Sequence, residues 1–132
     1  MGRQIAASLC KCSSEGVCHR DIKPENVLLC GRAVQPDWSR TPLVKLADFG
    51  LAIELGPGER AQGRGLVGSL VYMAPEIVEQ RPYGFEVDMW SLGVSLYFAL
   101  SGDLNKGCWG EGSSGRGEAG LLRSHFRRRI WK

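Results

Sequence analysis

The segment from residue 86 to residue 100 constrains the fold of this chain more than any other stretch. It is apolar on nearly every face of a helix, and its charged residues, Glu86 and Asp88, lie at its start. A helix that is apolar all round is usually buried on every side, so we expect it to be the central pillar of a core. It is shorter than the roughly 18 apolar residues of a membrane span. The length of the chain, 132 residues, suits one globular domain.

Charge is distributed unevenly along the chain. Residues 1–104 contain 10 Lys/Arg and 12 Asp/Glu, whereas residues 105–132 contain 7 Lys/Arg and 2 Asp/Glu. The mildly acidic first part excludes a basic nucleic-acid-binding body. The Gly-rich basic stretch 105–132 has no periodicity, and we expect it to be a disordered tail. Contact of Arg127–Arg129 with nucleic acid, acidic membrane or an import receptor is the alternative reading.

Five cysteines, four of them in the first 30 residues, match no paired zinc-binding spacing. We expect reduced thiols, because free Cys is often a small buried hydrophobe. The N-terminus lacks the apolar region of a signal peptide, and no membrane span is present. These features predict a soluble protein of the cytoplasm, or of the nucleus.

Apolar periodicity predicts several shorter elements. Residues 4–12 should form a helix that ends at Gly16, and residues 27–29 and 43–46 should pair as a β-hairpin. Five glycines between residues 56 and 68 predict a mobile loop. Pro75 suits the first turn of a short helix through Val78.

Three motifs stand in a fixed order in the middle of the chain. They are His19-Arg20-Asp21-Ile22-Lys23-Pro24-Glu25-Asn26, then Asp48-Phe49-Gly50, then Ala74-Pro75-Glu76. Phosphoryl transfer needs positioning, metal ions and a group that orients the attacking hydroxyl. Asp21 suits that last role, Lys23 suits charge neutralisation, and Asn26 and Asp48 offer the oxygen ligands that magnesium prefers. Each motif alone would be a weak signal, but the ordered set is specific.

The ordered set matches the signature of protein kinases, and residues 3–104 resemble a serine/threonine kinase. Lys23 is typical of that class, and the segment 83–104 is closest to the calcium/calmodulin-dependent kinase group. The resemblance implies an α+β fold, in which this chain is a fragment of the mostly helical large (C-terminal) lobe with a short β-hairpin. The small lobe is expected to be absent.

The resemblance also implies roles for individual residues. Asp21, Lys23 and Ser69 would be catalytic, and Asn26 and Asp48 would bind Mg²⁺. Asp88 would hold the backbone of the loop at residues 19–21, and His19 would stack on Phe49. ATP and a protein substrate are the implied partners, and the residues implied to bind the nucleotide are Lys23, Glu25, Asn26, Leu28 and Asp48.

Departures from the family pattern qualify this expectation. No glycine-rich phosphate loop or strand-borne lysine precedes residue 3, and the pattern ends near Leu104. We therefore expect a fragment that binds ATP very weakly, transfers no phosphate alone and leaves Glu76 without its usual arginine. The helix at 86–100 should also lack part of its covering shell and expose an apolar patch. No calmodulin-binding helix follows, so calmodulin is not supported as a partner. A catalytically dead binding or decoy module, and a truncated gene product, remain the alternatives.

The sequence also bears on whether phosphorylation regulates this protein. An Arg before the catalytic Asp, here Arg20, usually pairs with a phosphate on the activation segment. Residues 51–68 contain no Ser, Thr or Tyr. We therefore expect that phosphorylation within 51–68 does not switch this protein.

Overall fold

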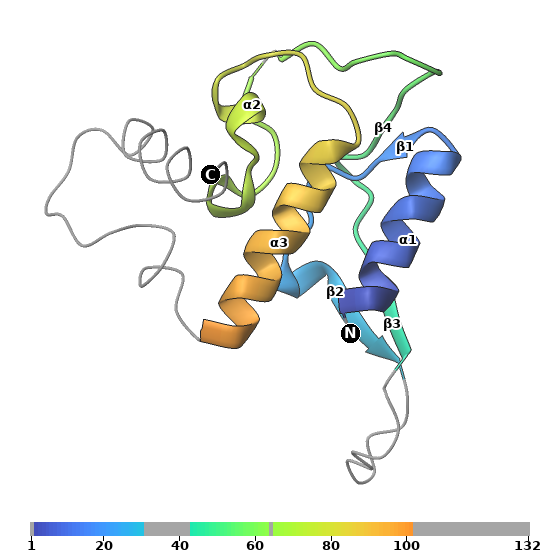
Figure 1. Ribbon diagram of the computed structural model, residues 1–132, viewed down its shortest axis with the longest axis vertical. Helices are drawn as coiled ribbons and strands as arrows, with labels where there is room; N and C mark the ends of the chain where they lie inside the picture. The colour runs from blue at the N-terminus through green and yellow to red at the C-terminus, as the bar shows by residue number, and fades with distance from the viewer. Residues whose placement is uncertain (1, 31–42, 64, 102–132) are drawn as a thin grey trace, which may run out of the picture. The chain divides into compact units, whose positions relative to one another are not determined.

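A computed structural model describes residues 2–30, 43–63 and 65–101 of the chain (Figure 1). The chain divides into two compact units, residues 1–95 and residues 96–132, and the second is described only over 96–101. The expected tail at 105–132 and most of the expected hairpin loop therefore lie outside the described residues.

The first helix, α1, spans Gly2–Ser14 and is longer at both ends than the expected 4–12. Ile5 and Leu9 are its buried residues. The helix lies along β3, where the Gln4 side-chain oxygen accepts a hydrogen bond from the Val44 N–H at 2.9 Å (Figure 1). Gly16 follows with a φ of +76°, a conformation that glycine adopts without strain.

The predicted hairpin is confirmed. Strand β2 (Val27–Cys30) pairs antiparallel with β3 (Leu43–Leu46), in a register that sets Val27 opposite Leu46. A second pair, β1 (Val17–Cys18) with β4 (Ile53–Glu54), was not expected. Strands of two residues carry no alternation that a sequence can reveal. The two pairs give short antiparallel strands among helices, the elements of an α+β fold.

The core of this unit is a cluster of residues from loops, helices and strand β1. The short helix α2 (Pro75–Val78) forms where it was predicted, with Pro75 in its first turn. A backbone bridge joins Ala61 to Tyr83, so the glycine-rich segment is attached to the loop before the last helix. The buried members of the cluster are Cys18, Leu55, Met73, Ala74, Ile77, Tyr83 and Val87.

The last helix, α3, spans Glu86–Ser101 and confirms the predicted helix. The apolar pattern alone predicted burial on every side, which the structure does not show, but the expected exposed apolar patch is present. Met89 and Leu100 are 48 % and 89 % exposed, and Tyr97 is also exposed. The buried positions recur three to four residues apart and form one stripe, because short loops, and not a shell of helices, cover this helix within the described residues. That stripe consists of Val87, Asp88, Ser91, Leu92, Val94 and Ser95.

Candidate active site

The loop at residues 19–21 is held by a carboxylate from α3. Asp88 is 3 % exposed, and its two oxygens accept hydrogen bonds from the backbone N–H groups of His19 and Arg20, each at 2.8 Å. A buried carboxylate needs such donors, because an unpaired charge in the interior is costly. The expected contact between Asp88 and this loop is therefore present. It presents the next residue, Asp21, in one defined place.

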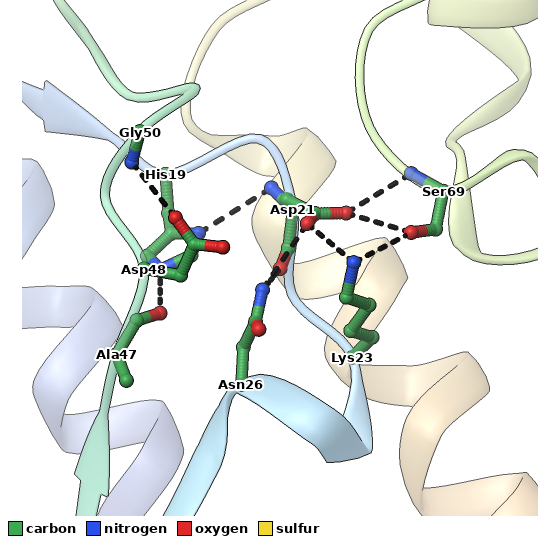
Figure 2. A network of polar contacts seen from close by, with 8 residues as sticks. All are labelled: His19, Asp21, Lys23, Asn26, Ala47, Asp48, Gly50 and Ser69. Atoms are coloured by element: carbon green, nitrogen blue, oxygen red, sulfur yellow. Dashed lines mark hydrogen bonds and ion pairs between the residues drawn. The ribbon is translucent and has the colours of Figure 1, made fainter.

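His19 connects the loop to the segment after β3. Its ring lies 4.5 Å from the ring of Phe49, between centroids, in a tilted arrangement. The Asp21 N–H donates to His19 Nδ1 at 3.3 Å, so Nε2 carries the proton and donates to the Ala47 carbonyl at 3.1 Å (Figure 2). The expected contact of His19 with Phe49 is present, and the histidine fixes both segments around Asp21.

Four hydrogen bonds converge on the Asp21 carboxylate (Figure 2). Oδ1 accepts from the Ser69 N–H at 3.0 Å and from the Ser69 hydroxyl at 2.9 Å. Oδ2 accepts from Lys23 Nζ at 2.7 Å and from Asn26 Nδ2 at 3.1 Å. Lys23 Nζ also donates to the Ser69 hydroxyl at 2.9 Å, which closes a ring of Asp21, Lys23 and Ser69. The structure brings together the three residues that the sequence nominated as catalytic.

This network sets the charges of its members. Burial alone would raise the pKa of Asp21, but the hydrogen bonds from Lys23 and Ser69 outweigh burial and hold it below its ordinary value of 3.8. The hydrogen bond to Asp21 is the main cause that raises the pKa of Lys23 above 10.5. At neutral pH the pair is therefore a carboxylate and an ammonium, and Asp21 is a hydrogen-bond acceptor only.

The two nominated magnesium ligands lie at the same end of the hairpin. Asn26 precedes β2 and Asp48 follows β3 by two residues, and the Ala47 N–H donates to the Asn26 carbonyl at 2.9 Å. Asn26 Nδ2 donates to Asp21, which leaves its side-chain oxygen as the atom for a cation. Asp48 is exposed, has a φ of +59° and accepts from the Gly50 N–H at 3.2 Å. Two side-chain oxygens fit Mg²⁺, which usually takes its remaining ligands from phosphate and water.

The other nominated nucleotide-binding residues lie outside this network. Glu25 is exposed on the turn that precedes β2, and Leu28 is half-exposed on the hairpin. Neither forms a hydrogen bond with Asp21, Lys23 or Ser69 in the part of the chain that the structure describes, although the Glu25 carboxylate contributes to the raised pKa of Lys23. The carboxylate of Glu76 likewise forms no ion pair within residues 2–30, 43–63 and 65–101.

Two partners of Arg20 were not foreseen from the sequence. Its Nε donates to the Leu51 carbonyl at 2.6 Å, and NH1 donates to the Tyr83 hydroxyl at 3.1 Å. Both partners are distant in sequence, and neither has a local pattern that marks it.

Within the described residues, no helix is long and apolar enough to cross a membrane.

Comparison with known proteins identifies a family and related sequences for this chain. The family model described as protein kinase domain matches residues 1–108. The chain is 45 % identical over 100 residues to the calcium/calmodulin-dependent protein kinase type II alpha chain of Drosophila melanogaster, covering 76 % of this chain and 18 % of that one. The delta subunit of the type II kinase of Oryctolagus cuniculus matches with the same identity, over 76 % of this chain and 17 % of its own length. The chain thus spans less than a fifth of these relatives.

Proposed function

Because this chain belongs to the protein kinase family, we propose that it supplies the catalytic loop of a serine/threonine kinase that transfers the γ-phosphate of ATP to a protein hydroxyl. One observation carries the proposal. Ser69 donates to one oxygen of the Asp21 carboxylate, and Lys23 and Asn26 donate to the other, in a site that keeps the carboxylate ionised. Without these hydrogen bonds, nothing would position the Asp21 carboxylate for chemistry.

In this proposal Asp21 orients the attacking hydroxyl. Its carboxylate accepts a hydrogen bond from the substrate hydroxyl and takes up the proton as the new bond from oxygen to phosphorus forms. The bond between the γ-phosphorus and the bridging oxygen breaks, and ADP leaves with the electron pair. Lys23, whose ammonium is 2.7 Å from Asp21, places positive charge beside the transferring phosphate. Ser69 keeps both groups in register.

Magnesium and the nucleotide would be held next to this loop. Mg²⁺ supplies charge neutralisation on the phosphates when it is bound. The oxygens of Asn26 and Asp48 would be its protein ligands, because both lie at the same end of the hairpin. Leu28 would lie beneath the adenine, and Glu25 would contribute to the nucleotide side of the same turn. These assignments rest on residue chemistry and on the family resemblance.

The domain assignment is part of the proposal. Residues 3–104 would form part of the large, C-terminal lobe of a kinase domain, and residues 105–132 would be a separate basic tail. The presence of Lys23 two residues after Asp21 favours serine or threonine over tyrosine as the acceptor. We propose that it acts on a protein substrate in the cytoplasm or the nucleus, and the calcium/calmodulin dependence in the relatives' names is a property of those relatives.

A binding module without catalysis is the second candidate. Leu28 is 50 % exposed and Phe49 is 46 % exposed, so the described residues offer one wall of a nucleotide site and leave it open to water. One wall provides too few contacts to hold a nucleotide well. This observation favours very weak ATP binding by the chain on its own, with docking to another protein as its remaining activity.

Calorimetric titration of ATP·Mg²⁺ and a phosphate-transfer assay separate the two candidates. The first sample is the chain itself, for which we expect very weak binding and no transfer. The second is a chimera in which the matched 100 residues of the Drosophila kinase are replaced by those of this chain. The kinase proposal predicts transfer by the chimera, reduced about a hundredfold or more by Asp21→Ala.

Glu15→Ala is the matched control, because it removes an exposed carboxylate on the surface beyond α1. This variant should transfer phosphate at the unaltered rate. A folded chimera that binds a protein substrate without any transfer would favour the binding module. Transfer that survives Asp21→Ala would contradict the catalytic role of Asp21.

A further inference from the structure

Arg20 lies between the catalytic loop and the segment that follows Asp48. Its own N–H is held by Asp88, and its φ of +67° is in the left-handed region, which directs the chain sharply into Asp21. Its guanidinium donates to the Leu51 carbonyl at 2.6 Å and to the Tyr83 hydroxyl at 3.1 Å. The position of Arg20 is thereby linked to two segments far away in the sequence.

Tyr83 is attached to the glycine-rich segment through its backbone. The Ala61 N–H donates to the Tyr83 carbonyl at 2.8 Å, and the Tyr83 N–H donates to the Ala61 carbonyl at 3.1 Å. The ion pair between Arg60, directly before Ala61, and Glu86, three residues after Tyr83, joins the same two segments. Tyr83 therefore holds the segment by its main chain and the catalytic loop by its hydroxyl.

The ring of Tyr83 makes this a rigid connection. The side chain is 2 % exposed and packs in the core cluster with Cys18, Leu55 and Ile77. A tyrosine in such a place has few rotamers, so its hydroxyl is held at a fixed point. A hydrogen bond from a guanidinium to a fixed acceptor is stronger than one between neutral groups.

The neighbouring segment contains no hydroxyl side chain that could carry a phosphate for this guanidinium. Residues 51–68 contain no Ser, Thr or Tyr, so no phosphorylated side chain can form there and pair with Arg20. An arginine opposite a phosphate is one way to order a loop. Here the Leu51 carbonyl and the Tyr83 hydroxyl occupy the guanidinium without any phosphate.

We propose that Tyr83 is a positioning residue for Asp21, and that its hydroxyl, acting through Arg20, keeps the segment 51–68 and the catalytic loop together without phosphorylation. The inference rests on the proposed function, because positioning of Asp21 matters to the rate only if Asp21 acts in phosphate transfer. The contact itself is independent of that function and is measurable in the chain alone.

The first test is hydrogen exchange of backbone amides in the 132-residue chain. Tyr83→Phe keeps the buried ring and removes only the hydroxyl, so the fold should persist. The amides of Ala61 and Tyr83 should exchange about tenfold faster, since a hydrogen bond to a charged group is lost. The Val44 amide, which donates to Gln4, should exchange as before.

Tyr97→Phe is the matched control. Tyr97 lies on α3, is 38 % exposed and donates no hydrogen bond to the residues that the structure describes. This variant should leave the Ala61 amide unchanged. Unchanged exchange at Ala61 in Tyr83→Phe would overturn the proposal, and so would equal acceleration of the Ala61 and Val44 amides, which would mark a loss of overall stability only.

The second test is kinetic and uses the chimera with the Drosophila kinase. Tyr83→Phe should lower kcat about tenfold and leave the KM for ATP unchanged, because the hydroxyl acts on the catalytic loop. Arg20→Met should remove this effect, so that adding Tyr83→Phe to it changes nothing more. A change in the KM for ATP alone, or full additivity of the two substitutions, would overturn the proposal.

The two tests separate this inference from the proposed function. Faster exchange at Ala61 in a chain whose wild-type chimera transfers no phosphate would support the contact and contradict the kinase activity. Transfer by the chimera that is the same with Tyr83→Phe would support the kinase activity and overturn the role of Tyr83.

Discussion

Asp88 shows how much of the site depends on a single side chain. It is buried, and its two oxygens accept the N–H groups of His19 and Arg20. These two residues precede Asp21 directly, so the carboxylate that orders them also orders the nominated base. The family resemblance identified Asp88 from the sequence, because the segment Val87–Val94 carries the pattern of the family's central helix. No local feature of that helix would have paired it with a loop 69 residues away.

Asp88→Asn should destabilise the folded chain by about 2–3 kcal/mol, because one of the two backbone N–H groups loses a charged acceptor and faces an amide N–H instead. Urea denaturation followed by far-UV circular dichroism measures this change. Glu15→Gln, at an exposed carboxylate, should leave the midpoint unaltered. Equal midpoints for Asp88→Asn and the wild type would show that the loop holds its shape without this carboxylate.

At the scale of elements, the predicted helices and the hairpin formed where their patterns placed them. Pro75 began a short helix, and residues 27–29 and 43–46 paired. The partial burial of α3 agrees with the expected loss of part of its covering shell and not with its apolar pattern alone, because such a pattern shows what a helix can bury and does not show what covers it. The pairing of β1 with β4 was missed because two-residue strands depend on their neighbours more than on their own residue types.

Alanine substitutions at two glycines should have opposite effects on the stability of the fold. Gly68 precedes Ser69 with a φ of +100°, and a Cβ there would overlap the Arg20 carbonyl oxygen. Gly93 is exposed on α3, and a Cβ there would meet nothing within 4 Å. Gly68→Ala should therefore destabilise the fold by about 1–3 kcal/mol. Gly93→Ala should stabilise it by about 0.5–1 kcal/mol through lower backbone entropy in the unfolded chain.

Thermal melts of the two alanine variants beside the wild type test this pair. The melting temperature should fall for Gly68→Ala and rise for Gly93→Ala. A drop for both would mean that α3 requires glycine at position 93 for a contact outside the described residues. No drop for Gly68→Ala would mean that the segment before Ser69 can move away from Arg20.

Over the first unit as a whole, contacts between distant loops hold the site together. Ser69 reaches Asp21 over 48 residues, Tyr83 reaches Arg20 over 63 residues, and the Ser91 hydroxyl donates to the Tyr72 carbonyl at 2.7 Å. Several of these contacts involve a charged group. The stability of the unit should therefore respond to pH through the groups whose pKa values folding changes.

Acid should destabilise the folded chain through Asp21. Its pKa is lowered in the folded state, so its carboxylate contributes stability that is fully present above its ordinary value of 3.8. This contribution is lost as the pH falls through the lowered pKa, because the proton binds the unfolded chain more tightly. One such group changes the free energy of unfolding by at most about 1.4 kcal/mol per pH unit.

Urea titrations between pH 7 and pH 2 measure this loss. Lys23→Gln should flatten the acid part of the profile, because the ammonium donor that lowers the pKa of Asp21 is gone. Lys11→Gln, which removes a lysine from an exposed pair on α1, should keep the wild-type profile. A profile for Lys23→Gln that coincides with that of the wild type would contradict the assignment of acid sensitivity to this pair.

The amino-acid sequence by itself determined the residue types, the motif order and the class of chemistry. Asp21, Lys23 and Asn26 lie within six consecutive residues, so their proximity follows from the covalent chain and from one turn. The family resemblance also identified Ser69 and Asp88, but only the tertiary structure decided which groups surround Arg20 and what covers α3. Arg20 donates hydrogen bonds to the Leu51 carbonyl and the Tyr83 hydroxyl. Helix α3 is buried along one stripe only. The physical reason is that a main-chain carbonyl and a fixed hydroxyl are recognised by their position, and position depends on the packing of loops that have no periodic pattern.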